Sequence, residues 1–218
     1  MTLALFDLDN TLLDGDSDYQ WGRFLIAEGI VDAAYYEREN QYFYDQYRTG
    51  ALDIYEFSRF AFKPLSETPL PKLHKLRDGF IAQHIRPIIL PKARDLLARH
   101  RRQGDLLVVI TATNRFVTAP IVKELGVDAL IATDPEFKEG RYTGELQGIP
   151  CFKEGKVTRL NAWLEQTEQD LTDSWFYSDS HNDIPLLDIV THPVAVDADP
   201  QLAEYARKKN WPIISLKD

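Results

Sequence analysis

The chain begins with a short apolar run that ends in two carboxylates, and this run places the strongest limit on the fold. Residues Leu3–Phe6 are followed by Asp7 and, two positions later, by Asp9. Such a run is typical of a strand buried in a parallel sheet, and parallel sheets bind ligands at the carboxyl ends of their strands. We therefore expect an α/β sheet whose first strand delivers two acidic side chains to a ligand site.

The spacing of these carboxylates suits phosphate or metal chemistry. Alternate side chains of an extended strand lie on one face, so Asp7 and Asp9 can approach the same phosphate or metal ion. Two carboxylates that lie close together repel each other unless a cation or a shared proton intervenes. Residues 9–11 equally suit a simple turn and helix cap, and the segment by itself does not separate the two interpretations.

Composition indicates an ordinary globular protein. Its 218 residues suffice for one sizeable domain, or for a core domain with an inserted subdomain. A formal net charge of -9 disfavours nucleic-acid binding, and no apolar stretch approaches the ~20 residues of a membrane span. We expect a cytoplasmic protein with no nucleic-acid or membrane partner, and the sequence predicts no oligomeric state. The single cysteine, Cys151, is expected to be structural.

Apolar runs alternate with helical patterns along most of the chain. Three more strands are expected, at residues 106–110, 175–177 and 194–196, with a short one at 213–214. Helices are expected at residues 91–102, 156–166, 182–190 and 201–209. The alternation predicts a doubly wound parallel sheet with helices on both faces, and turn glycines between 134 and 148 suggest a hairpin.

The segment from residue 14 to 85 breaks this alternation. It contains no convincing strand, several helix-like stretches and fourteen of the 25 aromatic residues. We interpret it as a helical cap domain (14–85) inserted into an α/β core domain (1–13 and 86–218). Most of its aromatic side chains are expected to form its own core, and a few to face the active site.

Polar residues follow two of the later predicted strands. Thr111 offers a hydroxyl for phosphate, although for this segment taken alone a helix cap is the favoured explanation. Asp179 and Asp183 flank a strand-to-helix turn, where Asp179 can reach a metal ion and Asp183 can orient that ion or its waters. Asn182 or Asp183 also suits the role of helix cap.

A lysine at the start of a predicted helix is a candidate anion ligand. Lys156 follows Gly155, and its ammonium group would lie beside the positive end of the helix. There it can hold an anion and offset the charge of a nucleophilic carboxylate. Lys153 lies close by in sequence, so spacing alone does not choose between the two lysines.

Taken in order, these segments resemble the haloacid dehalogenase superfamily of phosphohydrolases, most closely its phosphoserine phosphatase-like branch. The resemblance rests on the DxDxT pattern at 7–11, the hydroxyl of Thr111, the pair Gly155-Lys156, and the DSxxD pattern at 179–183. The helical insertion directly after the first motif is the cap position of that branch. The resemblance covers essentially the whole chain and implies a Rossmann-like core with a helical cap.

The resemblance implies a two-step phosphatase mechanism. Asp7 would attack phosphorus and form an aspartyl-phosphate, and Asp9 would protonate the leaving oxygen and then activate water. Dehalogenases of the superfamily need neither the second acid nor the metal, so Asp9 together with Asp179 disfavours dehalogenation. Two alternatives stay open: phosphotransfer to an alcohol, and a non-catalytic module that binds phosphate or is phosphorylated at Asp7.

The resemblance also implies the ligands. Magnesium would be held by the Asp7 carboxylate, the Asp9 backbone carbonyl and Asp179, with support from Asp183. The residues expected to bind phosphate or substrate are Thr11, Asp16, Thr111, Lys156 and Asn182.

Substrate choice depends on the cap. Asp16 stands where phosphoserine phosphatases carry a glutamate that contacts the substrate amine. The arginine that binds the substrate carboxylate in that branch has no clear counterpart, because Ala61 occupies its aligned position, although Arg59 is near. An acidic, aromatic-rich cap without this arginine favours a cationic or aromatic amine phosphate. We expect a small amino-alcohol phosphate, with histidinol phosphate first and phosphoserine second.

Overall fold

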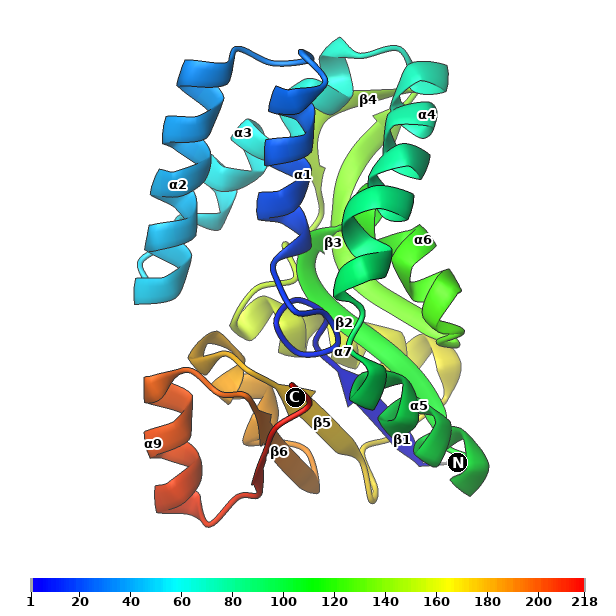
Figure 1. Cartoon of the computed structure of the whole chain (residues 1–218). Coiled ribbons are helices and arrows are strands. Elements are labelled where there is room, and N and C mark those ends of the chain that lie inside the picture. Colours follow the sequence, from blue (N-terminus) through cyan, green and yellow to red (C-terminus); the bar gives the residue numbers. More distant parts are fainter. Residues whose placement is uncertain (1, 218) are drawn as a thin grey trace.

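Residues 2–217 are described by the computed structural model, in which seven strands form one sheet (Figure 1). The strands are β1 (Leu3–Phe6), β2 (Leu106–Asn114), β3 (Ala129–Lys138), β4 (Arg141–Gln147), β5 (Trp175–Ser178), β6 (His192–Val196) and β7 (Ile213–Ile214). They lie in the order β4-β3-β2-β1-β5-β6-β7. All neighbouring strands are parallel except β3 and β4, which form an antiparallel hairpin. The predicted α/β fold and the predicted hairpin are both confirmed.

Nine α-helices lie in the described part of the chain. They are α1 (Ser17–Ala27), α2 (Ala33–Thr49), α3 (Ile54–Glu67), α4 (Leu70–Phe80), α5 (Pro91–Gln103), α6 (Arg115–Leu125), α7 (Glu154–Thr167), α8 (Ile184–Leu187) and α9 (Pro200–Lys209). A short π-helix (Ile81–Ile85) and a 3-10 turn (Arg86–Ile88) lead from α4 into α5, and a second 3-10 turn (His181–Asp183) precedes α8. None of the described helices is long and apolar enough to cross a membrane.

Helices cover both faces of the sheet. As a result, all four residues of β1 are buried. Ala4 and Phe6 lie in a cluster that includes side chains of α5 and α6. Leu3 and Leu5 lie in a second cluster with side chains of α7, α8 and α9. This two-residue alternation places β1 in the middle of a doubly covered sheet, so the residues after it emerge at the carboxyl edge.

The cap helices α1 to α4 follow directly after β1, and no strand lies between residues 14 and 85. They lie on the carboxyl-edge side of the sheet, next to the β3–β4 hairpin, against which α3 packs (Figure 1). Trp21, Phe62 and Phe80 are buried in the same cluster as Phe6 of the core. These three side chains join the sheet to its insertion, whereas Phe60 packs against Tyr36 and Phe43 within the insertion, as the sequence led us to expect. The boundary of the cap domain stays a prediction.

Two elements differ from the sequence-based expectation. Helix α6 and the parallel half of β3 were not predicted, and α6 carries Pro120 in its interior, which interrupts a helical pattern. The helix expected over 182–190 is instead a 3-10 turn followed by the four-residue α8. The helix begins only at Ile184 because Asp183 has ψ of 1°, outside the helical region, and Pro185 suits the first turn of a helix.

Candidate active site

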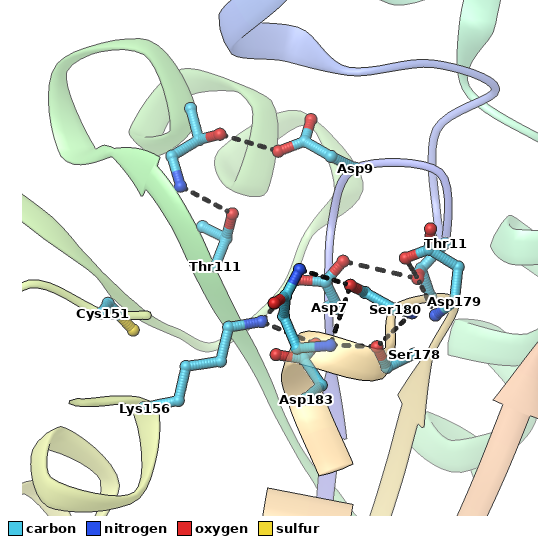
Figure 2. Close-up of polar contacts among 12 residues, drawn as sticks. Asp7, Asp9, Thr11, Thr111, Cys151, Lys156, Ser178, Asp179, Ser180 and Asp183 are labelled. Atoms are coloured by element: carbon cyan, nitrogen blue, oxygen red, sulfur yellow. Dashed lines mark hydrogen bonds and ion pairs between the residues drawn. The ribbon is translucent and has the colours of Figure 1, made fainter. Parts of the chain in front are cut away.

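The carboxyl ends of β1 and β5 bring together the residues that the sequence singled out (Figure 2). Nζ of Lys156 donates to Oδ1 of Asp7 at 2.7 Å and to Oδ2 of Asp183 at 2.8 Å. Lys156 is only 3% exposed, so this ammonium group is held inside the protein between two carboxylates. Lys153 points elsewhere and donates to the backbone oxygen of Gly50 at 2.7 Å. Of the two candidate lysines, Lys156 is therefore the one beside Asp7.

Local chain geometry fixes the position of Lys156. A Cβ on Gly155 would lie 2.1 Å from the backbone oxygen of Pro150, so only glycine fits before the lysine. Burial by itself lowers the pKa of Lys156, but the charges of Asp183 and Asp7 outweigh burial and raise it. The lysine is therefore a permanent ammonium group. Ser178 donates to Asp183 at 2.7 Å and holds that carboxylate against it.

Thr11 lies between two carboxylates on the other side of Asp7. Its Oγ1 is 3.4 Å from Oδ2 of Asp7 and 3.2 Å from Oδ1 of Asp179, and it accepts from the backbone N–H of Asp179. One hydroxyl can donate to only one of these carboxylates at a time. Lys156 brings one positive charge to Asp7 and Asp183, so negative charge stays in excess among Asp7, Asp179 and Asp183.

The pKa values of Asp7 and Asp179 reflect this excess of negative charge. Burial raises the pKa of Asp7 to about 7; Asp183 and Asp9 add to the rise, and Lys156 opposes it. Burial, together with Asp7 and Asp183, raises the pKa of Asp179 well above its usual range. A cation placed between them would restore both carboxylates to their ionised form.

The donor set fits a small, hard cation. Asp7 and Asp179 offer only oxygen, and Mg²⁺ is usually held by one or two carboxylates, with waters and substrate phosphate completing its coordination. Among residues 2–217, no three His, Cys, Asp or Glu side chains form a complete metal-binding group. The predicted magnesium site needs only three protein ligands: the carboxylates of Asp7 and Asp179 and the backbone carbonyl of Asp9. Asp183 was expected only to support these ligands.

Asp9, the second acid of the DxDxT pattern, accepts hydrogen bonds from two residues that are not hydrogen-bond partners of Asp7 in the described chain. Oδ1 of Asp9 accepts from the backbone N–H of Ser17 at 2.6 Å, and Oδ2 accepts from the hydroxyl of Thr113 at 2.8 Å. Burial and the charge of Asp16 raise the pKa of Asp9 to about 6. The backbone N–H of Thr113 donates to Thr111, at 3.2 Å. Thr113 was not among the predicted site residues, although its place two positions after Thr111 puts it on the same face of β2.

Asn182 connects the site to the cap. Its Nδ2 donates to the backbone oxygen of Tyr47 at 3.2 Å, while its buried Oδ1 has no partner in the described chain. Cys151 is fully buried, and burial raises the pKa of its thiol to about 12, as suits the structural role expected of it.

A cavity beneath the cap extends from Asp7 and Asp9. Its other carboxylates are Asp16, which caps α1, and Asp18 in the first turn of that helix. Its aromatic side chains are Tyr19, Phe43, Tyr44, Tyr47 and Phe57. None of the described residues that line it is Lys, Arg or His. Arg59, the nearest candidate for a carboxylate ligand, instead lines a separate cleft between α2 and α3.

The cavity beneath the cap is partly open to solvent, and its free volume of about 50 Å³ is room for a few water molecules. The C-terminal end of α2 meets the core through the hydrogen bonds of Lys153 to Gly50 and Asn182 to Tyr47. These two hydrogen bonds hold the end of α2 against the core beside the site.

Comparison with known proteins agrees with this geometry. The family model of haloacid dehalogenase-like hydrolases matches residues 4–188. A histidinol-phosphatase of Neisseria meningitidis serogroup C is 44% identical, and the match covers 99% of each chain. A protein of unknown function from Bordetella pertussis Tohama I has a similar structure, with a TM-score of 0.93, 44% identity, and coverage of 99% of this chain and 100% of that one.

A substrate-bound phosphoserine phosphatase matches with a TM-score of 0.72 at 21% identity, over 99% of this chain and 93% of that one. At this identity the match establishes the fold alone. The sheet, the carboxylates at its edge and the buried lysine define a hydrolase of the haloacid dehalogenase type, and the chain belongs to this family. It is a phosphatase with the fold of the phosphoserine phosphatases.

Proposed function

We propose that the chain is a Mg²⁺-dependent phosphomonoesterase that acts through an aspartyl-phosphate at Asp7 on a small amino-alcohol phosphate, histidinol phosphate ahead of phosphoserine. The observation that carries this proposal is the polarity of the cavity. Asp7, at one end of the cavity, accepts a hydrogen bond from the buried ammonium group of Lys156, whereas the cavity itself is lined by carboxylates and aromatic rings without a cation. A phosphate suits the end at Asp7, and a cationic leaving group suits the rest of the cavity.

In the first step a carboxylate oxygen of Asp7 forms a bond to phosphorus, and the bond from phosphorus to the leaving alcohol breaks. Asp9 gives its proton to the departing oxygen. In the second step Asp9 takes a proton from water, and the resulting hydroxide displaces Asp7 and releases phosphate. A pKa of about 6 suits this exchange, because the group is readily found in both forms near neutral pH.

The remaining predicted residues hold the phosphate and the ion. Lys156 offsets negative charge on Asp7 and the transferred group, and Thr111 and Asn182 offer polar contacts at the edge of the sheet. Asp7, Asp179 and the backbone carbonyl of Asp9 would hold Mg²⁺. When bound, this ion neutralises charge on the phosphate oxygens and keeps Asp7 ionised.

Two findings support histidinol phosphate as the first choice. The relative from Neisseria that is 44% identical is named a histidinol-phosphatase. The carboxylate of phosphoserine would have no cationic side chain to meet in the cavity, because Arg59 lies outside it and Ala61 is buried and apolar. A buried charge without a partner is costly, so the cavity disfavours phosphoserine.

The test compares kcat/KM for histidinol phosphate and phosphoserine with purified protein and Mg²⁺. We expect a clear preference for histidinol phosphate, and no turnover of either substrate by Asp7→Asn. The matched control is Asp45→Asn, which removes one exposed carboxylate from α2 and leaves the cavity intact. A preference for phosphoserine would refute the substrate order, and Mg²⁺-dependent turnover by Asp7→Asn would refute the role of Asp7.

A further inference from the structure

The substrate cavity contains a carboxylate that neither the proposed chemistry nor the sequence motifs use. Asp18 lies in the first turn of α1 and lines the cavity together with Asp9 and Asp16. Its Oδ1 accepts one hydrogen bond, from the side-chain amide of Asn114 at 3.3 Å. Within the described chain, Oδ2 has no hydrogen-bond partner, and neither oxygen has an ion-pair partner.

Asp18 differs in this respect from the acid at the start of the same helix. Oδ1 of Asp16 accepts from the backbone N–H of Tyr19 at 2.8 Å, which is the ordinary bond of a helix cap. Among the described residues, Asp18 caps no backbone N–H group. Removal from solvent, together with the charges of Asp16 and Asp9, raises the pKa of its carboxyl well above the usual range. A cation beside this partly buried carboxylate would favour its ionised form.

The surroundings of Asp18 suit a flat cation. Two pairs of aromatic rings line the same cavity, with ring centroids 5.0 Å apart for Tyr19 and Tyr44 and 5.4 Å apart for Phe43 and Phe57. Aromatic faces attract cations and also stack on planar rings. The combination of a carboxylate and aromatic rings therefore favours a protonated heteroaromatic group over a compact ammonium ion or an anion.

We propose that Asp18 is a specificity-determining residue that binds a second cationic group of the leaving alcohol, a protonated heteroaromatic ring such as imidazolium. This rests on the proposed function and deepens it, because it assigns the two positive groups of the alcohol to two different acids. Asp16 would hold the amine, and Asp18 would hold the ring between the aromatic side chains. The cavity then selects alcohols that carry both groups over alcohols that carry only the amine.

The test uses the full-length protein and two phosphate esters. Histidinol phosphate carries an amine and an imidazole, and ethanolamine phosphate carries the amine alone. We expect Asp18→Asn to lower kcat/KM for histidinol phosphate by about 10- to 100-fold, the loss typical of one charge-assisted hydrogen bond, and to lower that for ethanolamine phosphate much less. Asp18→Glu should recover part of the loss, and Asp45→Asn should leave the ratio of the two values unchanged.

A binding measurement separates failure of this proposal from failure of the proposed function. Calorimetric titration with histidinol, which has no phosphate, should show binding to the wild type and at least 10-fold weaker binding to Asp18→Asn. Equal affinity of the two proteins, or no binding to the wild type, would overturn the assignment of Asp18. Absence of Mg²⁺-dependent turnover of any phosphate ester would instead overturn the proposed function, whatever the titration gives.

Discussion

Replacing the proposed nucleophile with asparagine should make the metal-free protein more stable at alkaline pH. Asp7 is 5% exposed, and its pKa in the folded protein is about 7 against an ordinary value of 3.8. A shift of one unit corresponds to about 1.4 kcal/mol, so the ionised carboxylate costs the fold at most about 4 kcal/mol. We expect Asp7→Asn to recover about half of this bound, about 2 kcal/mol, because the neighbouring carboxylates titrate together and already share protons.

The sign of the effect follows from the raised pKa. At pH values below 3.8 the carboxyl is protonated in both folded and unfolded chains and costs nothing. The cost grows as pH rises from about 4 to about 7, and above 7 it is complete. The gain in stability from Asp7→Asn should therefore be small at pH 4.5 and largest at pH 8.

Thermal unfolding in EDTA at pH 4.5, 6 and 8 measures this gain. For a chain of this length about 2 kcal/mol corresponds to a rise in Tm of about 4–8 °C at pH 8. Added Mg²⁺ should raise the Tm of the wild type more than that of Asp7→Asn, because in the proposed function the ion is held by the native carboxylate. Asp45→Asn controls for the change in net charge. A lower Tm of Asp7→Asn at pH 8, or a difference independent of pH, would refute the reasoning.

Two further substitutions test other parts of the site. Asp9→Asn should slow turnover by about 10²- to 10⁴-fold, the usual contribution of a general acid, and leave Mg²⁺ affinity within a few-fold, since its backbone carbonyl is retained; a large loss of affinity in calorimetry would contradict this. Gly50→Ala should destabilise the protein more than Gly104→Ala in urea unfolding. Both glycines have positive φ, but a Cβ at Gly50 would lie 2.9 Å from Nε2 of His181, whereas Gly104 faces open space. Equal losses would show that the contact between cap and core is not tight.

The residues that follow the buried strands could be predicted from the sequence more readily than the contacts between their side chains. A buried strand followed by polar residues is a local pattern, so Asp7, Asp179 and Lys156 could be predicted together at one edge of the sheet. The partner of Lys156 was harder to predict. Asp183 was expected on the metal side, whereas in the structure its carboxylate accepts hydrogen bonds from Lys156 and Ser178. That arrangement depends on how α7 packs against the turn after β5, which no local pattern encodes; the predicted part of Asp183 in metal binding stays a prediction.

Asp18, α6 and the first half of β3 could not be recognised from the sequence, because each has a more common interpretation. An acid in the first turn of a helix, such as Asp18, normally complements the helix dipole, so its sequence gives no reason to place it in a cavity. The half of β3 over 129–133 is short, and Pro120 interrupts the helix before it. The structure shows α6 and this half of β3 packed against β2, a contact between distant segments that the local sequence does not reveal.

The central position of β1 has a consequence for how the chain folds. Leu3 pairs with Leu106 on one side and Ala4 pairs with Trp175 on the other, so β1 finds neither of its partners until synthesis has passed β2. Pairing over such distances is slow, and an unpaired apolar strand is prone to aggregate. Charged residues directly after such a strand oppose aggregation. We therefore expect Asp7 and Asp9 to lower the tendency of the unpaired strand to aggregate before the active site has formed.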